Sequence, residues 1–280
     1  MTRQVDSTRS QPLSAWLTPK WIARQLLGRS NRLSGVYSSF SEALARSTYP
    51  GGAPITQDLA AAQDVLPGEA HFCRDGIRFL YPPRGLSLSA AAVLAAAAQK
   101  KDTTRVLDFG GGAAALYLTH RSLWASIPGL SWNIVEREQL VREAKPIFSG
   151  LPINWYTSIK DACADHQPDI VILSSVLQYL NDPSATLHSI CGLLPTWLVI
   201  DRTPVGANGP DIVAMQKSPR NLHGSSYPSW IFGSNGAVLI PAQAYECLLN
   251  QFSDDPVLLH RLRPVIYQGW LYRRVDPTCE

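Results

Sequence analysis

The sequence has no long run of charge of one sign. Its 25 basic and 22 acidic residues are dispersed, and the formal net charge is only +3. Proteins that bind nucleic acid cluster lysine and arginine along the phosphate backbone, so we expect no nucleic-acid partner. Hydrophobic residues make up 45% of the chain and charged residues 17%, which excludes a mainly disordered protein and indicates a globular one.

Long apolar stretches and paired cysteines are also missing. The longest apolar stretch, residues 86–98, falls short of the roughly 20 residues that cross a bilayer. We interpret it as a buried helix and expect no membrane association. The five cysteines are far apart and form no Cys-x-x-Cys pair, which indicates ordinary thiols and no metal site. The polar N-terminus shows no signal-peptide pattern, so we expect a cytoplasmic protein.

Short β-rich runs alternate with helical patterns from about residue 104 onward. The expected strands cover residues 105–109, 132–135, 153–156, 169–173 and 197–200. Three of them are apolar at consecutive positions, as is typical of strands that helices cover on both faces. The alternation predicts an α/β fold, a Rossmann-like doubly wound sheet of seven mostly parallel strands.

The flanking regions suggest additions to this sheet. Residues 1–100 read as an N-terminal helical extension or cap, and residues 101–280 as the main domain. Residues 202–240 are rich in Gly, Pro, Ser, Tyr and Trp, and we expect them to form an inserted substrate lid. A helix is predicted at 241–252, followed by a C-terminal antiparallel hairpin formed by runs at 257–262 and 267–274.

The most informative motif is VLDFGGGAAALYL at residues 106–118, where an apolar strand passes through a glycine cluster into a helix. Glycines permit a tight turn and let a ligand approach the backbone. Free N–H groups at the following helix N-terminus suit a carboxylate or phosphate. The alternative is a structural tight turn with no ligand.

Polar residues lie at the ends of four of the expected strands, and Asp108 is at the end of the first. Glu136 comes after the second strand, where a carboxylate can accept hydrogen bonds from both hydroxyls of a ribose. It lies 28 residues after Asp108, and the alternative interpretation is a solvated glutamate at a helix start. Ser174 and Asp201 follow the fourth and fifth strands. The carboxyl edge of an open α/β sheet is where ligands bind, so these groups should converge there.

These motifs, with IVERE, DIVILSSVLQYLNDP, LVIDRTP, SSYPSWIF and YQGWLYRR, resemble the class I S-adenosylmethionine-dependent methyltransferases over roughly residues 104–274. More narrowly, they resemble a bacterial group of methyltransferases assigned by homology. The resemblance implies S-adenosyl-L-methionine as cofactor, with the turn at 110–112 on its methionine part, Glu136 on the ribose, and Thr157 and Ser158 beside the adenine. The implied cofactor contacts are Asp108, Phe109, Gly110, Gly111, Gly112, Glu136, Arg137, Thr157, Ser158, Ser174, Ser175 and Gln178. Ala114 replaces a glycine that many relatives have.

Methyl transfer from a sulfonium needs a positioned acceptor and, for a hydroxyl acceptor, a base. Asp201 is the first candidate for that base, and an ion pair with Arg202 is its structural alternative. Tyr179, Tyr227 and His223 are further catalytic candidates, each with a packing or surface role as the alternative. Tyr227 and Trp230 lie in the expected lid. The partner is a small molecule, a glycan or secondary-metabolite precursor among the options, accepting on O or N.

Two other functions share parts of this pattern. A nicotinamide-dependent oxidoreductase also has a glycine-rich turn and an acid on the second strand, but no Tyr-x-x-x-Lys motif follows Tyr179 or Tyr227. A catalytically inactive protein that binds the cofactor as a sensor or interaction partner is the non-enzymatic alternative. A metal-dependent methyltransferase is disfavoured, because serines stand where a carboxylate ligand is expected after the fourth strand. The oligomeric state stays open.

Overall fold

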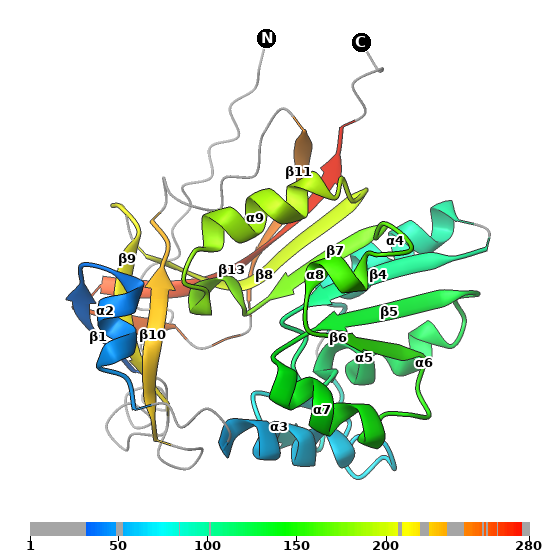
Figure 1. Ribbon diagram of the computed structural model, residues 1–280, viewed down its shortest axis with the longest axis horizontal. Coiled ribbons are helices and arrows are strands. Elements are labelled where there is room, and N and C mark those ends of the chain that lie inside the picture. The colour runs from blue at the N-terminus through cyan, green and yellow to red at the C-terminus, as the bar shows by residue number, and fades with distance from the viewer. Residues whose placement is uncertain are drawn as a thin grey trace.

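A twisted, mainly parallel sheet forms the centre of the protein (Figure 1). The computed structural model describes residues 32–48, 53–83, 85–100, 102–206, 209–218, 224–233, 244–253, 255, 257–261 and 263–275. The strand order is β11-β13-β8-β7-β4-β5-β6, and β12 pairs with β13 outside this path. The strands of this sheet are β4 (Thr104–Phe109), β5 (Leu130–Val135), β6 (Ile153–Tyr156), β7 (Ile170–Ser174), β8 (Trp197–Gly206), β11 (Tyr245–Phe252), β12 (Leu258–His260) and β13 (Arg263–Arg274).

The five strands predicted from residue 104 onward are all present and parallel to one another. β4 pairs with β5 and β7, β5 with β6, and β7 with β8, each in parallel register. β13 runs antiparallel to both β8 and β11, so the C-terminal antiparallel element is confirmed. The predicted doubly wound α/β sheet of seven strands is therefore confirmed, and the order reverses between β4 and β7 as doubly wound folds require.

Helices cover both faces of this sheet, which explains the continuously apolar strands. Alternate strand residues belong to two separate buried clusters, one on each face. One face packs against α4 (Leu88–Gln99), α5 (Ala115–Thr119), α6 (Arg121–Trp124) and α7 (Glu138–Ile147), and the other against α8 (Ile159–Ala162) and α9 (Pro183–Gly192). The predicted buried helix corresponds to α4, which Ser87 caps by accepting a hydrogen bond from the Ala90 N–H at 3.1 Å. Side-chain capping of this kind satisfies a free helical N–H.

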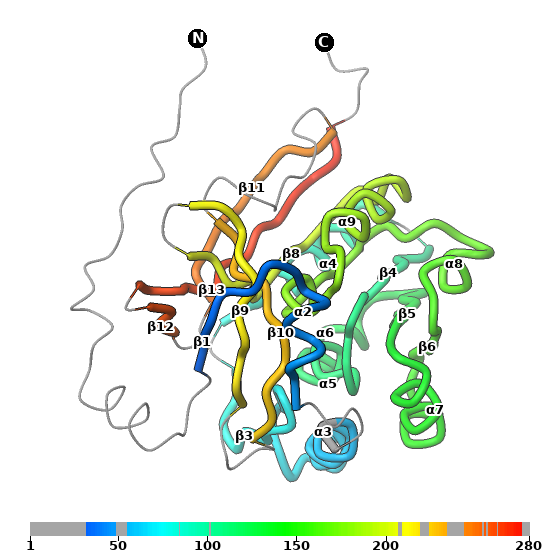
Figure 2. Tube along the Cα trace, turned by 60° about the vertical axis from the view of Figure 1, so that its left-hand side comes forward, coloured from blue at the N-terminus to red at the C-terminus, as the bar shows by residue number. Residues whose placement is uncertain are grey.

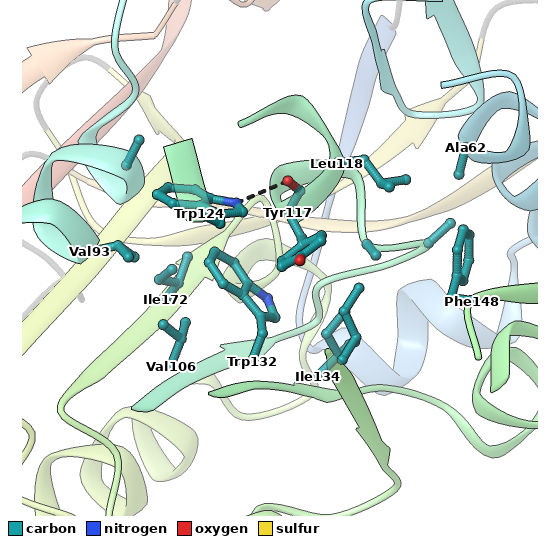
Figure 3. Close-up of a cluster of buried hydrophobic side chains, with 14 of the residues drawn as sticks. Ala62, Val93, Val106, Tyr117, Leu118, Trp124, Trp132, Ile134, Phe148 and Ile172 are labelled. Atoms are coloured by element: carbon teal, nitrogen blue, oxygen red, sulfur yellow. Dashed lines mark hydrogen bonds between the residues drawn. The ribbon is translucent and has the colours of Figure 1, made fainter. Parts of the chain in front are cut away.

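Aromatic residues of β5, α5 and α6 pack together in the core (Figure 3). Trp132 of β5 is fully buried, and its ring lies 5.4 Å from those of both Tyr117 and Trp124. The Trp124 indole N–H donates a hydrogen bond to the Tyr117 carbonyl at 3.0 Å, drawn as the dashed line in Figure 3. Such aromatic pairs bury large apolar areas in specific geometries, and this one supports the start of α5 directly after the turn.

The N-terminal region is only partly the expected helical extension. It contains α2 (Phe40–Ala45), α3 (Ala53–Gln63) and α4, but also β1 (Arg32–Tyr37) and a hairpin of β2 (Phe72–Arg74) and β3 (Ile77–Phe79). β1 pairs with β9 (Ile212–Lys217), and β9 pairs with β10 (Ser226–Ile231), both antiparallel. These three strands form a second sheet beside the first (Figures 1 and 2).

This second sheet shows that much of residues 202–240 is regular structure. β8 continues to Gly206 and the chain returns as β9 and β10, and the function of the segment as a substrate lid stays a prediction. Its strand content was hidden because β1, the third strand, lies about 180 residues away in the sequence (Arg32 pairs with Lys217). Residues 207–208, 219–223 and 234–240 of the segment lie outside the described residues.

The helix predicted for 241–252 is also wrong where the structure describes it. Residues 245–252 form β11, which pairs with β13 from Tyr245↔Arg274 to Phe252↔Gln268. The helical periodicity was misleading because β11 is an edge strand whose residues are mostly exposed, so burial imposes no alternation on it. In the part of the chain that is described, no helix combines the length and hydrophobicity needed to cross a membrane.

Candidate cofactor and acceptor site

The glycine turn between β4 and α5 is held close to its neighbours. Gly110 and Gly112 have φ angles of +73° and +56°, in the left-handed region that favours glycine. A Cβ on Gly110 would lie 2.4 Å from Val176, and one on Gly111 would lie 2.7 Å from the Asp108 carboxylate. A Cβ on Gly112 would instead enter open space, with no described atom within 4 Å. The turn therefore exposes bare backbone on one side and is tightly packed on the other.

Asp108 lies beneath this turn at the end of β4. Its side chain is 1% exposed and accepts a hydrogen bond from the Trp132 indole N–H at 3.3 Å. Burial raises the pKa of Asp108, the hydrogen bond from Trp132 lowers it and the charge of Glu136 raises it, so that the pKa lies at about 7.

Glu136 stands directly after β5, beside the glycine turn. Phe109 and Val135 are partners in the β4–β5 register, and the Gly110 N–H donates to the Val135 carbonyl at 2.9 Å. The Glu136 side chain is 14% exposed, and its carboxylate accepts a hydrogen bond from the Arg137 N–H at 2.8 Å. The Arg137 guanidinium lies 3.7 Å from the same carboxylate. The structure therefore brings the glycine turn and Glu136 to neighbouring strand ends.

The segment that follows β7 is the next part of the candidate site. Ser174 pairs with Asp201 in the β7–β8 register, and the Ser175 N–H donates to the Asp201 carbonyl at 2.9 Å. Gln178, in the short helix η2 (Leu177–Tyr179), is fully buried, and its amide donates to the Ser175 hydroxyl at 3.0 Å. Gln178 thus holds the segment in place, and its Oε1 has no hydrogen-bond partner among the described residues.

The other implied cofactor contacts differ in their surroundings. Thr157 is exposed after β6, and Ser158 is the N-cap of α8, where its hydroxyl accepts from the Asp161 N–H at 3.1 Å. The Ser158 hydroxyl is therefore already occupied by the helix. Phe109 is half-buried and packs on the face covered by α8 and α9. The assignment of Phe109, Thr157 and Ser158 to the cofactor site stays a prediction.

Asp201 lies within β8 and is 9% exposed. Its carboxylate accepts a hydrogen bond from the Arg202 N–H at 2.8 Å and packs so closely on Gly269 that a Cβ there would lie 2.3 Å from it. Burial raises the pKa of Asp201, and the hydrogen bond from the Arg202 backbone lowers it. The guanidinium of Arg202 forms its ion pairs with residues other than Asp201. The role of Asp201 as a base stays a prediction.

A buried ion-pair network lies beside Asp201. The Arg202 guanidinium donates to Asp255 at 2.8 and 3.1 Å and to Asp75 at 2.8 Å. Arg202 holds the pKa of Asp255 at about 2 against the effect of burial. These residues border a cavity, hereafter the Arg202 cavity, whose polar and aromatic lining consists of Asp75, Ser175, Tyr179, Arg202, Asp255 and Tyr267.

Two of the predicted catalytic tyrosines are in contact, and one of them, Tyr179, lines this cavity. The rings of Tyr179 and Tyr227 lie 5.4 Å apart at an interplanar angle of 71°. Burial raises the pKa of both phenols, so they stay protonated at neutral pH and act as donors, not bases. The Tyr227 hydroxyl accepts a hydrogen bond from Gln216 at 3.1 Å. His223, the other candidate, lies outside the described residues.

Sequence reasoning missed Asp58, Asp75, Asp255 and Tyr267. The sequence carries a weak signal for Asp75, because an Asp-Gly pair is typical of a two-residue hairpin turn. Asp75 and Gly76 form such a turn, with φ angles of +51° and +70°. Nothing in the local sequence indicates that Asp75 contacts Arg202. Burial, followed by the charges of Asp75 and Glu136, raises the pKa of Asp58 on α3 to about 7. Asp58 lies beside the Asp75–Gly76 turn, because a Cβ on Gly76 would be 3.1 Å from its carboxylate.

Among the described residues, no group of three or more His, Cys, Asp or Glu side chains is arranged to hold a metal ion. No protein-family model matches the chain, and no curated protein matches it. Solved structures do align with it at low identity.

The N-terminal domain of EvdMO1, solved in the presence of SAH and D-fucose, is 16% identical over 79% of this chain and 97% of that chain, with a TM-score of 0.45. MtNAS in complex with MTA and tNA is 12% identical over 79% of this chain and 71% of that chain, with a TM-score of 0.42. Magnesium protoporphyrin IX methyltransferase from Synechocystis PCC 6803, with bound SAM, is 14% identical over 67% of this chain and 78% of that chain, with a TM-score of 0.43. Because these scores are below 0.5, the fold class rests on the strand order of this chain itself.

Proposed function

We propose that this protein is an S-adenosyl-L-methionine-dependent methyltransferase that acts on a small-molecule acceptor. The observation that carries the proposal is the pairing of the open glycine turn with Glu136 at the ends of two hydrogen-bonded parallel strands, β4 and β5. A ligand with an amino-acid part and a ribose needs both kinds of group at neighbouring positions of one sheet edge.

The residues present fit this cofactor. Open space beside Gly112 admits a ligand against bare backbone, and the adjoining N–H groups at the start of α5 suit its carboxylate. Asp108 is held by Trp132 beneath the turn, where it would support the loop that binds the amino-acid part. Glu136 would accept hydrogen bonds from the ribose hydroxyls. When bound, S-adenosylmethionine supplies an electrophilic methyl group on a sulfonium.

The tasks left to the chain are to orient the acceptor, exclude water and take up a proton. Tyr179 and Tyr227 would orient the acceptor by donating hydrogen bonds, because their phenols stay protonated. Asp201 remains the candidate base for a hydroxyl acceptor, while an amine acceptor would need only to be held neutral. Trp230 fixes β10 to the segment after β7 by donating to the Leu180 carbonyl at 2.9 Å, so β10 would act as a wall of the acceptor site.

The antiparallel position of β13 between β8 and β11 favours this function over a nicotinamide-dependent oxidoreductase. Dinucleotide-binding sheets are built from two parallel halves in the order 3-2-1-4-5-6, and the reversed strand interrupts that second half. A catalytically inactive cofactor-binding protein has the same turn and the same Glu136, so only turnover distinguishes it from the enzyme.

Calorimetry on the full chain tests the proposal with S-adenosylmethionine, S-adenosylhomocysteine and NAD as ligands. We expect binding of the first two and not of NAD, and loss of binding in the double variant Gly110→Val/Glu136→Ala. The matched control is Gly150→Val/Glu138→Ala, which alters an open surface glycine and an exposed glutamate. Binding of NAD alone, or unchanged binding in the first double variant, contradicts the proposal.

A further inference from the structure

The Arg202 cavity adjoins the glycine turn through a single short segment. Val176 packs on Gly110, while Ser175, the residue before it, lines the cavity. Asp58 lies beside the Asp75–Gly76 turn, where a Cβ on Gly76 would be 3.1 Å from its carboxylate, and the charges of Asp75 and Glu136 both raise its pKa. A molecule in the cavity would therefore lie next to a ligand bound on the turn.

Two non-glycine residues with strained backbone face each other in the cavity wall. Ser175 and Arg202 have φ angles of +58° and +52°, and they follow paired residues at the ends of β7 and within β8. Left-handed backbone costs free energy in residues other than glycine and persists where the surroundings enforce it, often at functional sites. Gln178 supplies that enforcement, because its amide donates to the Ser175 hydroxyl and, at 3.4 Å, to the Arg202 carbonyl.

The charge of the lining is compensated internally. Arg202 is its single cation, and it is paired with both lining carboxylates, Asp255 and Asp75. Arg74 lies a further 3.5 Å from Asp255. The Arg202 and Asp255 side chains are 18% and 11% exposed, so that pair is shielded from solvent, whereas the Asp75 side chain is 60% exposed. An arginine in this state has no uncompensated charge to offer an anionic ligand.

We propose that the Arg202 cavity is the acceptor site and that it selects an uncharged, hydroxyl-bearing acceptor. This inference rests on the proposed methyltransferase function and deepens it. A carboxylate or phosphate on the acceptor would face Asp75 and Asp255, whereas a neutral hydroxyl donates to those carboxylates and accepts from the phenols of Tyr179 and Tyr267. Burial raises the pKa of both phenols, which keeps them as donors at neutral pH.

Inorganic phosphate is a probe of whether Arg202 is free, and its binding is measured by calorimetry on the full chain. We expect weak or no binding to the wild-type protein and roughly tenfold tighter binding to Asp75→Asn, because one of the two compensating charges is removed. The double variant Asp75→Asn/Arg202→Gln should lose that gain. The control Asp64→Asn removes another carboxylate, one paired with Arg78 at 2.9 Å on the same N-terminal region, and should behave as the wild type.

Methyl transfer from methyl-labelled S-adenosylmethionine is then measured with two sets of hydroxylated compounds. Neutral monosaccharides and phenols form one set, and uronic acids and hydroxybenzoates form the other. Transfer confined to the neutral set supports the proposal, and transfer confined to the anionic set overturns it. Wild-type phosphate binding that Arg202→Gln abolishes also overturns it, as does an unchanged affinity in Asp75→Asn. Failure to bind S-adenosylmethionine would instead overturn the proposed function, while the phosphate result still decides the charge of the cavity.

Discussion

The two parts of the candidate site, the glycine-turn side and the Arg202 side, are built in different ways. The glycine-turn side combines residues 108–112 with residue 136, and both parts follow directly from adjacent strands. The Arg202 side joins residues 127 and 53 positions away from Arg202, namely Asp75 and Asp255. The first side is a local motif, and the second depends on the closure of the whole chain. Substitutions should therefore affect ligand binding on the first side and folding stability on the second.

The largest expected effect is on stability, from Arg202→Met. Removing the cation leaves Asp255, 11% exposed, without its main partner, and breaking one side of a buried pair costs about 3 to 5 kcal/mol. Urea unfolding at pH 7 measures the loss. The control Arg273→Met breaks an exposed pair with Glu246 and should cost under about 1 kcal/mol. Equal losses in the two variants would show that the Arg202 network adds no more stability than a surface pair.

This variant also has a pH signature. The pKa of Asp255 is lowered from 3.8 to about 2 in the folded protein, so its contribution to stability is present above pH 4 and is lost as the pH falls through 2. Arg202→Met should remove that part of the acid dependence.

Gly110→Val should have the second-largest effect, on cofactor affinity. The new side chain would collide with Val176 and force a residue with φ +73° to carry a Cβ. We expect at least about a 100-fold loss of affinity for S-adenosylmethionine, measured by calorimetry. Gly150→Val, at a glycine with no described atom within 4 Å of its Cβ position, should bind as the wild type. A cofactor affinity that survives Gly110→Val would mean that the turn has no part in binding.

Glu136→Gln should weaken cofactor binding by roughly 10- to 100-fold, because hydrogen bonds to a charged acceptor are worth about 1.5 to 3 kcal/mol. Glu138→Gln, two residues on and exposed, makes the same change of charge and should leave the affinity intact. Calorimetry with S-adenosylhomocysteine provides the measurement. The ribose assignment fails if the two variants bind equally well.

Asp108→Asn should change the pH dependence of stability and leave the fold at low pH unaffected. Burial raises the pKa of Asp108 from 3.8 to about 7, so its protonated form stabilises the ligand-free fold at low pH, and that contribution is lost as the pH rises through 7. The variant should equal the wild type near pH 4 and be more stable than it at pH 8, because asparagine has no charge to bury. Unfolding in urea at both pH values tests this, and parallel curves for the two proteins would contradict it.

How far the sequence predicts the molecule varies along the chain. The five parallel strands and the glycine turn were predictable, because consecutive apolar residues followed by glycine describe a buried strand and its tight turn locally. β11, which carries Leu249, was not predictable. It is an exposed edge strand, so its residues do not alternate between buried and exposed. β1 was missed because its partner β9 lies about 180 residues away along the chain.

The candidate site divides in the same way. Asp108 and Glu136 were predicted because the first lies near the end of a recognisable strand and the second directly follows one. Asp75 and Asp255 were missed because isolated aspartates in turns are common and local sequence does not reveal what they pair with. Arg202 was noticed only as a neighbour of Asp201, while the structure directs its guanidinium to the other two carboxylates.

Local sequence was thus enough to determine the central sheet, its glycine turn and the acid on the next strand, because burial periodicity and glycine conformation act within a few residues. Tertiary structure decided the second sheet, the exposed edge strand and the charge balance of the Arg202 cavity. Those features depend on desolvated contacts between residues more than fifty positions apart, and the strength of such contacts is set by burial, which only the folded chain creates.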